Sequence, residues 1–358
     1  MNKEWDYGIL DDAVTKGSSN ISLNKIKNDD GNYPVFGAKG FAKNVSFFHQ
    51  EEEYLAIIKD GAGIGRVSRH PAKSSIVATM QYIIPKPGYD IDFVKYFLLG
   101  LDFEKYRTGS TIPHVYYKDY KNVEFPLINL SEQQQIVEIL DQAFAAIDQA
   151  KVNIEKNIEN AKELFQSKLN QIFSQTGEGW EEKTWKEVLE IRSGRNQKEV
   201  ESPNGKYPIL GSAGKVMAYA NKYICEAGTT IIGRKGTINN PMYIETRFWN
   251  VDTAFGLHAL EGLNKRFLYF FCLSYDFTKR DKGSGRPSLV KNDLLKMTMP
   301  IPDLKSQNKI VTVCEEIKNK VEIIESQYLK KIDSLEELKK SILQKAFAGE
   351  LTQKEIAI

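Results

Sequence analysis

An internal repeat constrains this 358-residue chain more than any other feature of its sequence. The motif Gly-x-Tyr-Pro-x-x-Gly-x-x-Gly begins at Gly31 and again at Gly205, and a Gly-Ser loop that ends in proline begins at Gly109 and again at Gly283. The offset between the copies is 174 residues, and twice that offset nearly exhausts the chain. A sequence that repeats itself in register forms repeated structural units. We therefore expect two copies of one fold.

Each copy divides into two zones that differ in residue composition and hydrophobic pattern. The first zone holds short β-branched and aromatic runs punctuated by Gly and Pro, with room for a short helix at 92–99. Strands are expected at 54–58, 75–79, 81–84, 229–232 and 242–244. The second zone reads as one long helix. The predicted organisation is a first α/β (mixed α+β) globule at 1–130, a spacer helix at 131–173, a second globule at 174–304, a spacer helix at 305–350 and a tail at 351–358.

The two long helices carry narrow apolar stripes. Ser131 is the expected N-cap of the first helix, and no Pro or Gly follows before Phe173. Apolar residues recur at heptad spacing in both helices, interrupted in the first only by Lys151 and Lys168. The predicted helix-pairing residues are Leu140, Ile147, Ile154, Ile158, Phe165, Val321, Tyr328, Leu335 and Ile342.

The length of these helices favours pairing. A helix of this length spans roughly 60 Å, which the core of one globule cannot cover. We expect antiparallel pairing, in which each helix buries the stripe of the other and holds two equivalent globules apart with pseudo-two-fold symmetry. The alternative is that each helix packs only on its own globule.

Composition excludes several classes of protein. The chain is 41% hydrophobic and 27% charged with a formal charge of +2, which is typical of a globular protein with room for two cores. It has no apolar run long enough to cross a membrane and no signal-peptide pattern, so a cytoplasmic location is expected. The three cysteines and four histidines lack ligand spacing, so neither a metal site nor a disulfide is predicted.

Two motifs suggest an enzyme but do not support one. The segment from Tyr54 to Gly65 resembles a strand that runs into a glycine-rich cofactor loop. Such a loop should open a helix, yet Pro71 follows and no helical period is present, so a tight glycine hairpin is favoured. Asn240-Pro241-Met242-Tyr243 resembles the base-clamping Asn-Pro-Pro-Tyr loop of adenine methyltransferases without its second proline. We predict no catalytic residue and no bound cofactor.

Polar and basic loops on the globules suit contacts with DNA. Small hydroxyls, backbone amides and guanidinium groups on short loops match phosphate contact and base readout, although ordinary solubilising loops share this composition. The candidates in the first copy are Lys39, Lys43, Arg66, Arg69, Arg107, Ser110, Thr111 and His114. The candidates in the second copy are Lys215, Arg234, Lys235, Lys279, Arg280, Lys282, Ser284 and Arg286.

The charge balance of each copy moderates this interpretation. Residues 1–130 hold 16 Lys and Arg against 16 Asp and Glu, and residues 174–304 hold 19 against 15. A stand-alone DNA-binding protein usually has a stronger basic bias. We therefore expect partner subunits to supply part of the affinity for DNA.

These features together resemble the DNA specificity subunit of type I restriction-modification systems. The resemblance rests on the duplicated globules that begin near Trp5 and near Trp180 and Trp185, on the Pro-x-x-x-Leu-x-x-Gln sequence that opens each long helix, and on the closing stretch from Leu338 to Leu351. It covers essentially the whole chain.

The resemblance implies a non-catalytic reader of DNA. In that family each globule is a target-recognition domain for one half of a split DNA site. The paired helices set the spacing and dock methyltransferase subunits that bring S-adenosylmethionine and methylate adenine, joined in some systems by motor-nuclease subunits. The implied partners are double-stranded DNA with a bipartite site, two methyltransferase subunits and motor-nuclease subunits, with no membrane.

Two other classes of function are open to a chain of this kind. A fused methyltransferase-nuclease requires a methyl-donor loop and an intact Asn-Pro-Pro-Tyr/Phe motif, which this sequence lacks. A structural scaffold that binds protein partners without reading DNA is the alternative. Salt-sensitive binding of DNA by the assembled complex separates the scaffold from the specificity subunit.

Overall fold

The computed structural model describes residues 5–174, 179–212 and 214–351. Contacts divide the chain into unit 1, comprising Met1–Asn153 and Lys330–Ile358, and unit 2, comprising Ile154–Leu329. Each unit therefore holds one globule and a segment of each long helix. Apart from Leu351, the tail predicted at 351–358 lies outside the described residues.

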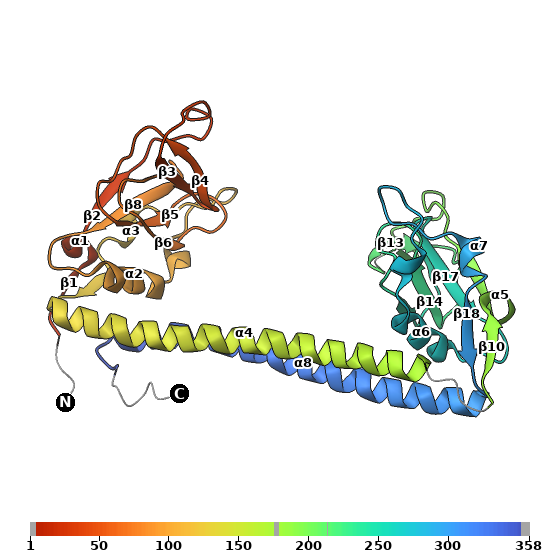
Figure 1. Ribbon diagram of the computed structural model, residues 1–358. Helices are drawn as coiled ribbons and strands as arrows, with labels where there is room; N and C mark the ends of the chain where they lie inside the picture. The colour runs from red at the N-terminus through yellow and green to blue at the C-terminus, as the bar shows by residue number, and fades with distance from the viewer. Residues whose placement is uncertain (1–4, 175–178, 213, 352–358) are drawn as a thin grey trace. The chain divides into compact units, whose positions relative to one another are not determined.

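The globule of unit 1, called globule 1 (residues 5–129), mixes short strands and helices (Figure 1). Its strands are β1 (Tyr7–Ile9), β2 (Val14–Ser18), β3 (Tyr33–Gly37), β4 (Gly40–Val45), β5 (Tyr54–Ile58), β6 (Val67–His70), β7 (Ser75–Ile76), β8 (Met80–Pro85) and β9 (Glu124–Pro126). Its helices are α1 (Leu10–Ala13), α2 (Ile91–Gly100), α3 (Tyr117–Tyr120) and the 3-10 helix η1 (Phe103–Tyr106). The mixed α/β prediction is confirmed.

Strand β5 is the centre of globule 1. The four-stranded sheet has the order β2-β8-β5-β6, and a three-stranded sheet β4-β3-β7 and the pair β1-β9 complete the globule. All five residues of β5 are buried. Because side chains alternate across a strand, Leu55 and Ile57 pack into the core that contains α2. Tyr54, Ala56 and Ile58 pack into the core beneath the three-stranded sheet.

The globule of unit 2, called globule 2 (residues 179–303), has the same architecture (Figure 1). Its strands are β10 (Glu181–Thr184), β11 (Leu189–Ser193), β12 (Tyr207–Leu210), β13 (Val216–Ala220), β14 (Thr229–Gly233), β15 (Met242–Ile244), β16 (Trp249–Asn250), β17 (Ala254–Ala259) and β18 (Thr298–Ile301). Its helices are α5 (Trp185–Val188), α6 (Lys265–Ser274), α7 (Lys291–Leu294) and η2 (Phe277–Arg280). The sheet orders β11-β17-β14-β15, β13-β12-β16 and β10-β18 match those of globule 1 strand for strand.

The strand pairing corrects the constant offset expected from the sequence. Tyr33 of β3 corresponds to Tyr207 of β12 at an offset of 174, but Tyr54 of β5 corresponds to Thr229 of β14 at 175. Helices α1 and α5 are also related by 175. The one-residue differences lie in the segments between strands, where they leave the pairing within the strands unchanged.

The repeated glycines of the Gly-x-Tyr-Pro motif are explained by close backbone packing. A Cβ on Gly31 would lie 2.2 Å from the carbonyl oxygen of Val45, and one on Gly205 would lie 2.5 Å from the backbone nitrogen of Ala220. Any side chain at either position would collide with the neighbouring strand. Close approach of backbone therefore requires glycine in both copies.

The two long helices are α4 (Leu130–Ser174) and α8 (Leu304–Phe347). Ser131 was expected to cap the first helix, but this prediction is wrong by two residues. The side chain of Asn129 accepts a hydrogen bond from the backbone N–H of Glu132 at 3.0 Å. The carboxylate of Asp303 accepts the equivalent bond from Ser306 at 2.9 Å. A short polar side chain just before the helix satisfies an amide of the first turn.

A buried glutamine ties each helix to its globule. Gln133 accepts a hydrogen bond from the backbone N–H of Asp90 at 2.7 Å and donates to the carbonyls of Gly88 and Ile128. Gln307 makes the same three bonds with Asn264, Gly262 and Pro302. Both side chains are 0% exposed. The glutamine of the Leu-x-x-Gln sequence thus satisfies three backbone groups that are otherwise difficult to pair.

The helices run antiparallel. In unit 1 Lys151 pairs with Glu336 and Asp148 with Lys339, so the partner moves back along α8 as the position advances along α4. In unit 2 Lys162 pairs with Glu325 at 2.7 Å in the same register. The lysine that interrupts the stripe at position 151 is therefore matched by a carboxylate.

Both helices also contribute to the globule cores. In unit 1 the main core includes Ile136 and Leu140 of α4 together with Leu343 and Ala346 of α8. In unit 2 the main core includes Leu169 and Phe173 of α4 and Cys314 of α8. Helix pairing and packing on the globules thus occur together, so the two arrangements that the sequence left open are not exclusive.

The predicted pairing residues are buried to different depths. Leu140 is 0% and Ile147 is 2% exposed. The remaining predicted residues are all half-buried: Ile154, Ile158, Phe165, Val321, Tyr328, Leu335 and Ile342.

The three cysteines are buried, and burial raises the pKa of Cys225 and of Cys314 to about 12. Within the described part of the chain, no helix is long and apolar enough to cross a membrane.

Candidate nucleic-acid interface

Two loops of globule 1 are joined into one cluster. The first is the turn of the antiparallel β5–β6 hairpin, where Gly61, Gly63 and Gly65 have positive φ. The second is the segment 107–114. The backbone N–H of Gly61 donates to Pro113 at 2.9 Å, and Thr108 and His114 exchange backbone hydrogen bonds of 2.9 and 2.8 Å. The glycine-rich segment is thus a hairpin turn, as the sequence favoured, and it does not open a helix.

The same closure occurs in globule 2. Gly236 donates to Pro287 at 2.8 Å and Lys282 donates to Ser288 at 2.9 Å, which are the equivalents of the bonds in globule 1. A Cβ on Gly109 would lie 2.3 Å from the carbonyl oxygen of Ile112, and one on Gly283 would lie 1.9 Å from that of Arg286. The repeated Gly-Ser loop is therefore tightly packed at its first glycine in both globules, although Gly109 has a positive φ and Gly283 does not.

A different polar contact braces each loop cluster. In globule 1 the imidazole Nδ1 of His114 lies 2.7 Å from a carboxylate oxygen of Asp60. In globule 2 the carboxylate of Asp281 accepts backbone hydrogen bonds from Gly283 and Ser288, both at 2.8 Å. These amide donors hold the pKa of Asp281 below its usual value. The loops of the two globules are therefore held by chemically different side-chain contacts.

Some of the predicted residues of globule 1 reach this cluster. The guanidinium of Arg66 donates to the carbonyl of Ala38 at 3.2 Å, which brings it beside the exposed turn that carries Lys39. Ser110 and Thr111 are exposed at the tip of the second loop, and Arg107 at its start is held by Glu104 at 3.1 Å. Lys39, Arg66 and the 107–114 loop therefore present donors on neighbouring turns.

Two other predicted residues of globule 1 are used within the protein. The ammonium of Lys43 donates to the carbonyls of Ile26 and Lys27 at 2.9 and 3.1 Å. Arg69 pairs with Glu53 and Asp92, and the Glu53 hydrogen bond is the main cause of its raised pKa. A role for either in binding DNA would first require breaking these contacts.

In globule 2 the structure gathers two predicted cations. Lys215 and Arg286 line one pocket of about 400 Å³ together with Gln197 and Asp252. The guanidinium of Arg286 also lies against Gly236, in the turn that carries Arg234 and Lys235. Arg234 donates to the carbonyl of Asp252 at 3.2 Å, and its guanidinium carbon lies over the ring of Phe255 at 5.8 Å from the centroid. Basic side chains thus surround the loop cluster of globule 2.

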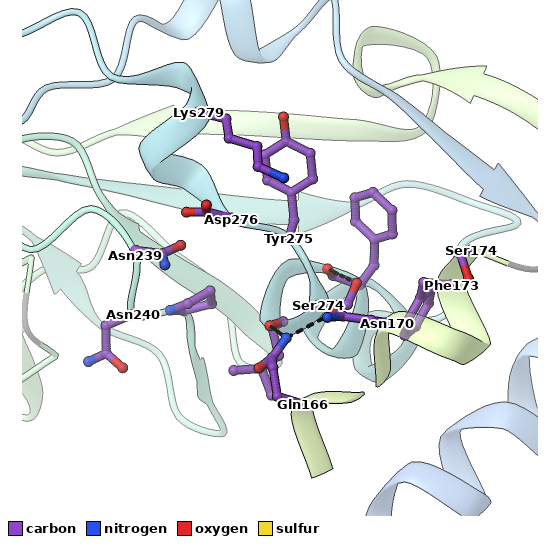
Figure 2. Close-up of a pocket in the computed structure, with 13 residues that line it drawn as sticks. Gln166, Asn170, Phe173, Ser174, Asn239, Asn240, Ser274, Tyr275, Asp276 and Lys279 are labelled. Atoms are coloured by element: carbon purple, nitrogen blue, oxygen red, sulfur yellow. Dashed lines mark hydrogen bonds between the residues drawn. The ribbon is translucent and has the colours of Figure 1, made fainter. Parts of the chain in front are cut away.

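Lys279 and Arg280 contact residues outside the loop cluster of globule 2. Lys279 lines a pocket of about 740 Å³ that α4 closes with Gln166 and Asn170 (Figure 2). Arg280 donates to the hydroxyl of Tyr275 at 2.9 Å. Lys282 and Ser284 are exposed on the loop cluster itself. The four neighbouring candidates therefore separate into two groups that serve different surfaces.

A basic pocket that the sequence analysis did not identify lies next to the loops of globule 1. Its lining residues come from α1, β2, β8, α3 and the segments next to the two loops and α3: Asp11, Lys16, Ser18, Lys59, Gln81, Tyr116, Tyr117, Lys118 and Lys121. These positions are far apart in the chain, so only the sheet order brings them together. The available signal was Lys59, which directly precedes the glycine turn.

The described part of the chain holds no candidate metal site. No three His, Cys, Asp or Glu side chains are grouped there as metal ligands. What the arrangement offers is two similar clusters of loops rich in donors, each on its own globule.

Both halves of the chain match the family model of the type I restriction modification DNA specificity domain, over residues 2–160 and 177–334. The chain is 25% identical over 357 residues to the type I restriction enzyme MjaVIII specificity subunit of Methanocaldococcus jannaschii, covering 85% of this chain and 80% of that protein. It is 23% identical over 406 residues to the EcoDI specificity subunit of Escherichia coli, covering 98% and 89%.

Solved structures share the fold. A chain from the structure of a type I R-M system, solved to explain complex assembly and conformational transition, has a TM-score of 0.74 at 15% identity and covers 97% of this chain and 98% of that chain. The HsdS subunit of Thermoanaerobacter tengcongensis has a TM-score of 0.56 at 15% identity, with 97% of each chain covered.

Proposed function

Because this chain belongs to the type I restriction-modification DNA specificity family, with two copies of the specificity domain, we propose that it reads a bipartite DNA site and recruits the enzymes that act there. Globule 1 reads one half-site and globule 2 reads the other. The subunit itself is non-catalytic and works in the cytoplasm.

One observation carries this proposal. The two globules close their loops with the same backbone hydrogen bonds, yet the side chains on those loops differ at nearly every polar position. Asp60 and His114 in globule 1 are replaced by Lys235 and Ser288 in globule 2. A shared scaffold with different donors is what two different base sequences require, because base edges are distinguished by their donor and acceptor patterns.

The helices supply the remaining part of the proposal. Their antiparallel pairing, with ion pairs in both units, supports a fixed spacing between the two half-sites. We infer that two adenine-N6 methyltransferase subunits dock on this subunit, one for each repeat, and that motor-nuclease subunits join the complex. The target-recognition boundaries at 1–130 and 174–304 belong to the same proposal.

The test is to co-express the chain with the methyltransferase encoded beside it and to map methylated adenines across the host DNA by long-read sequencing. The proposal predicts N6-methyladenine confined to a two-part motif with a fixed gap. A complex that forms but neither binds DNA in a salt-sensitive manner nor methylates it would instead support the scaffold. Methylation at a single uninterrupted motif would contradict the assignment of one half-site to each globule.

A further inference from the structure

The basic pocket of globule 1 has the features of a built anion site. It encloses about 380 Å³ and is lined by the side chains of Lys16, Lys59, Lys118 and Lys121. Of the lining residues the sole carboxylate is that of Asp11, which already accepts a hydrogen bond from Tyr117 at 2.7 Å and lies 3.7 Å from Lys121. The pocket therefore retains a net positive charge.

A buried amide without a partner lies in this pocket. The side chain of Gln81 belongs to a residue that is 4% exposed, and its Nε2 has no hydrogen-bond partner among the described residues. A buried amide donor that is left unpaired costs about 1–3 kcal/mol. Gln133 and Gln307, the other buried glutamines with known contacts, satisfy both ends of their amides. The unpaired donor thus points to an acceptor that a bound ligand supplies.

The pocket is continuous with the loop cluster. Lys59 is followed by Asp60, whose carboxylate holds His114, and the ring of His114 stacks on that of Tyr116 with centroids 5.9 Å apart. The backbone N–H of Val115 donates to the carbonyl of Lys59 at 2.9 Å. A strand of DNA lying across the loops would therefore pass the mouth of the pocket.

We propose that this pocket of globule 1 binds one phosphate of the DNA backbone, with Gln81 Nε2 as its buried donor and Lys16, Lys59 and Lys118 as its cations. The inference rests on the proposed function, because it takes DNA as the source of the phosphate. The lysine ammonium groups and the Gln81 amide nitrogen are donors, and phosphate oxygens are acceptors only. Such a contact fixes the register of the DNA on the globule and leaves base readout to the loops.

Globule 2 lacks this site. In the sheet, Gln81 pairs with Ile57, and the equivalent of that pair is Phe255 with Ile232. The equivalent of Lys16 is Ile191, which is 2% exposed, and the equivalent of Lys118 is Asn292. Arg234, at the position of Lys59, lies over the Phe255 ring with its guanidinium carbon 5.8 Å from the ring centroid. An aromatic ring therefore fills the space that holds the unpaired amide in globule 1.

The test compares variants of the chain in its assembled complex, bound to a duplex that carries its methylated motif. Gln81→Met removes the donor and retains the volume, and Lys16→Gln with Lys118→Gln removes exposed cations without disturbing the core. Lys25→Gln, at an exposed lysine of globule 1 outside the pocket, is the matched control. The measurement is the dissociation constant as a function of salt concentration.

We expect the Gln81→Met variant to bind about tenfold more weakly, the size of one missing hydrogen bond to a charged group. The paired lysine variant should reduce the slope of affinity against salt by about 0.9, the value for a single neutralised phosphate, and the Lys25→Gln control should not. If both pocket variants match the control while the complex still binds DNA, the pocket inference is wrong and the proposed function stands. A wild-type complex with no affinity for DNA refutes the proposed function itself.

A second experiment determines whether the bound phosphate belongs to the DNA backbone or is a free anion. Single methylphosphonate substitutions neutralise one backbone phosphate at a time. One position should weaken wild-type binding about tenfold and the Gln81→Met variant far less, since that variant already lacks the donor. Inorganic phosphate is the comparison ligand, followed by phosphorus NMR. Binding of inorganic phosphate that depends on Gln81, with no sensitive position in the DNA, would overturn the backbone assignment in favour of a free anion.

Discussion

The two globules show how one scaffold carries two different chemistries. They share the same sheet order and the same backbone hydrogen bonds between their loops. In both, a buried glutamine, Gln133 or Gln307, ties the long helix to the globule; these two residues are called the glutamine clamps. They differ in the side chains placed on that scaffold: globule 1 has a lysine pocket that contains the unpaired amide of Gln81, and globule 2 has Arg234 over the buried ring of Phe255. What the repeat preserves is therefore backbone geometry, and what it varies is the set of groups offered to a ligand.

The comparison also shows the limit of net charge as a guide. Globule 1 is neutral by count, which suggested weak binding of DNA. Its charges are unevenly placed: Arg69 and Glu53 neutralise one another, whereas four lysines line one pocket beside the single carboxylate of Asp11. Local placement of charge decides contact with a phosphate, because exposed charges farther apart than about 10 Å are largely screened at ordinary salt.

The largest expected effect is on the free energy of unfolding, when a charged residue replaces an isoleucine between the paired helices. Ile147 in unit 1 is 2% exposed, whereas Ile158 in unit 2 is half-buried. Ile147→Asp should reduce the free energy of unfolding of unit 1 by about 4 kcal/mol or more, because an unpaired carboxylate would be buried. Ile158→Asp should cost clearly less. Urea unfolding with hydrogen exchange resolved by segment measures both, and equal losses would show that the two pairings are equally deep.

A pH dependence should appear in globule 1 and not at the same position in globule 2. Burial lowers the pKa of His70 to about 4 from an ordinary value near 6.5, and its equivalent is Ile244. The unfolded chain therefore binds the extra proton first, so stability is retained above pH 6.5 and lost as the pH falls toward 4. The loss should total about 3 kcal/mol.

Hydrogen exchange of the two globules between pH 7 and pH 4.5 measures this difference, after correction for the intrinsic exchange rate. His70→Leu should remove the part of the pH dependence that is specific to globule 1. A variant that keeps the full pH dependence would assign it to other groups.

The two glutamine clamps, Gln133 and Gln307, should contribute equally to the free energy of unfolding. Gln133→Leu and Gln307→Leu each leave three backbone groups without their partner, and each should lower the free energy of unfolding by about 2–3 kcal/mol. Gln134→Leu, at the exposed neighbouring position, is the control. Thermal unfolding of the three variants gives the comparison, and a large inequality between the two clamps would show that the helices are attached differently.

The smallest effect is expected from a single loop residue. Arg286→Ala should weaken binding by about 1–3 kcal/mol and relax recognition at one base of the half-site of globule 2, if Arg286 contacts a base edge. The half-site of globule 1 should be unchanged. Methylation mapping with the variant checks both parts, and an unchanged motif with unchanged affinity would remove Arg286 from the interface.

Much of the fold could be predicted from the sequence because it depends on local signals. The strand at Tyr54–Ile58 and the helix near 92–99 follow from apolar runs, and the long helices follow from heptads without Pro or Gly. The cap at Asn129 was misassigned because Ser131 has the same local signature, and only the hydrogen bonds distinguish them.

The candidate site was less predictable because it depends on long-range pairing. Lys43 and Arg69 looked like free cations, but their partners lie 16 or more positions away in the sequence. The Gln81 pocket requires β2, β8 and α3 to meet, which no local pattern reveals. Sequence thus indicated the loops, and the structure showed which side chains on them remain available.

The central claim is that each globule recognises its own half-site. Its most direct test is a chain that carries globule 1 twice. A chain in which residues 179–303 are replaced by a second copy of residues 5–129 would be co-expressed with the methyltransferase, and its methylated adenines would be mapped. We predict that the half-site of globule 1 then occurs twice, as an inverted repeat with the original gap, and that the half-site of globule 2 disappears. Persistence of the original two-part motif would contradict the claim that each globule reads its own half-site.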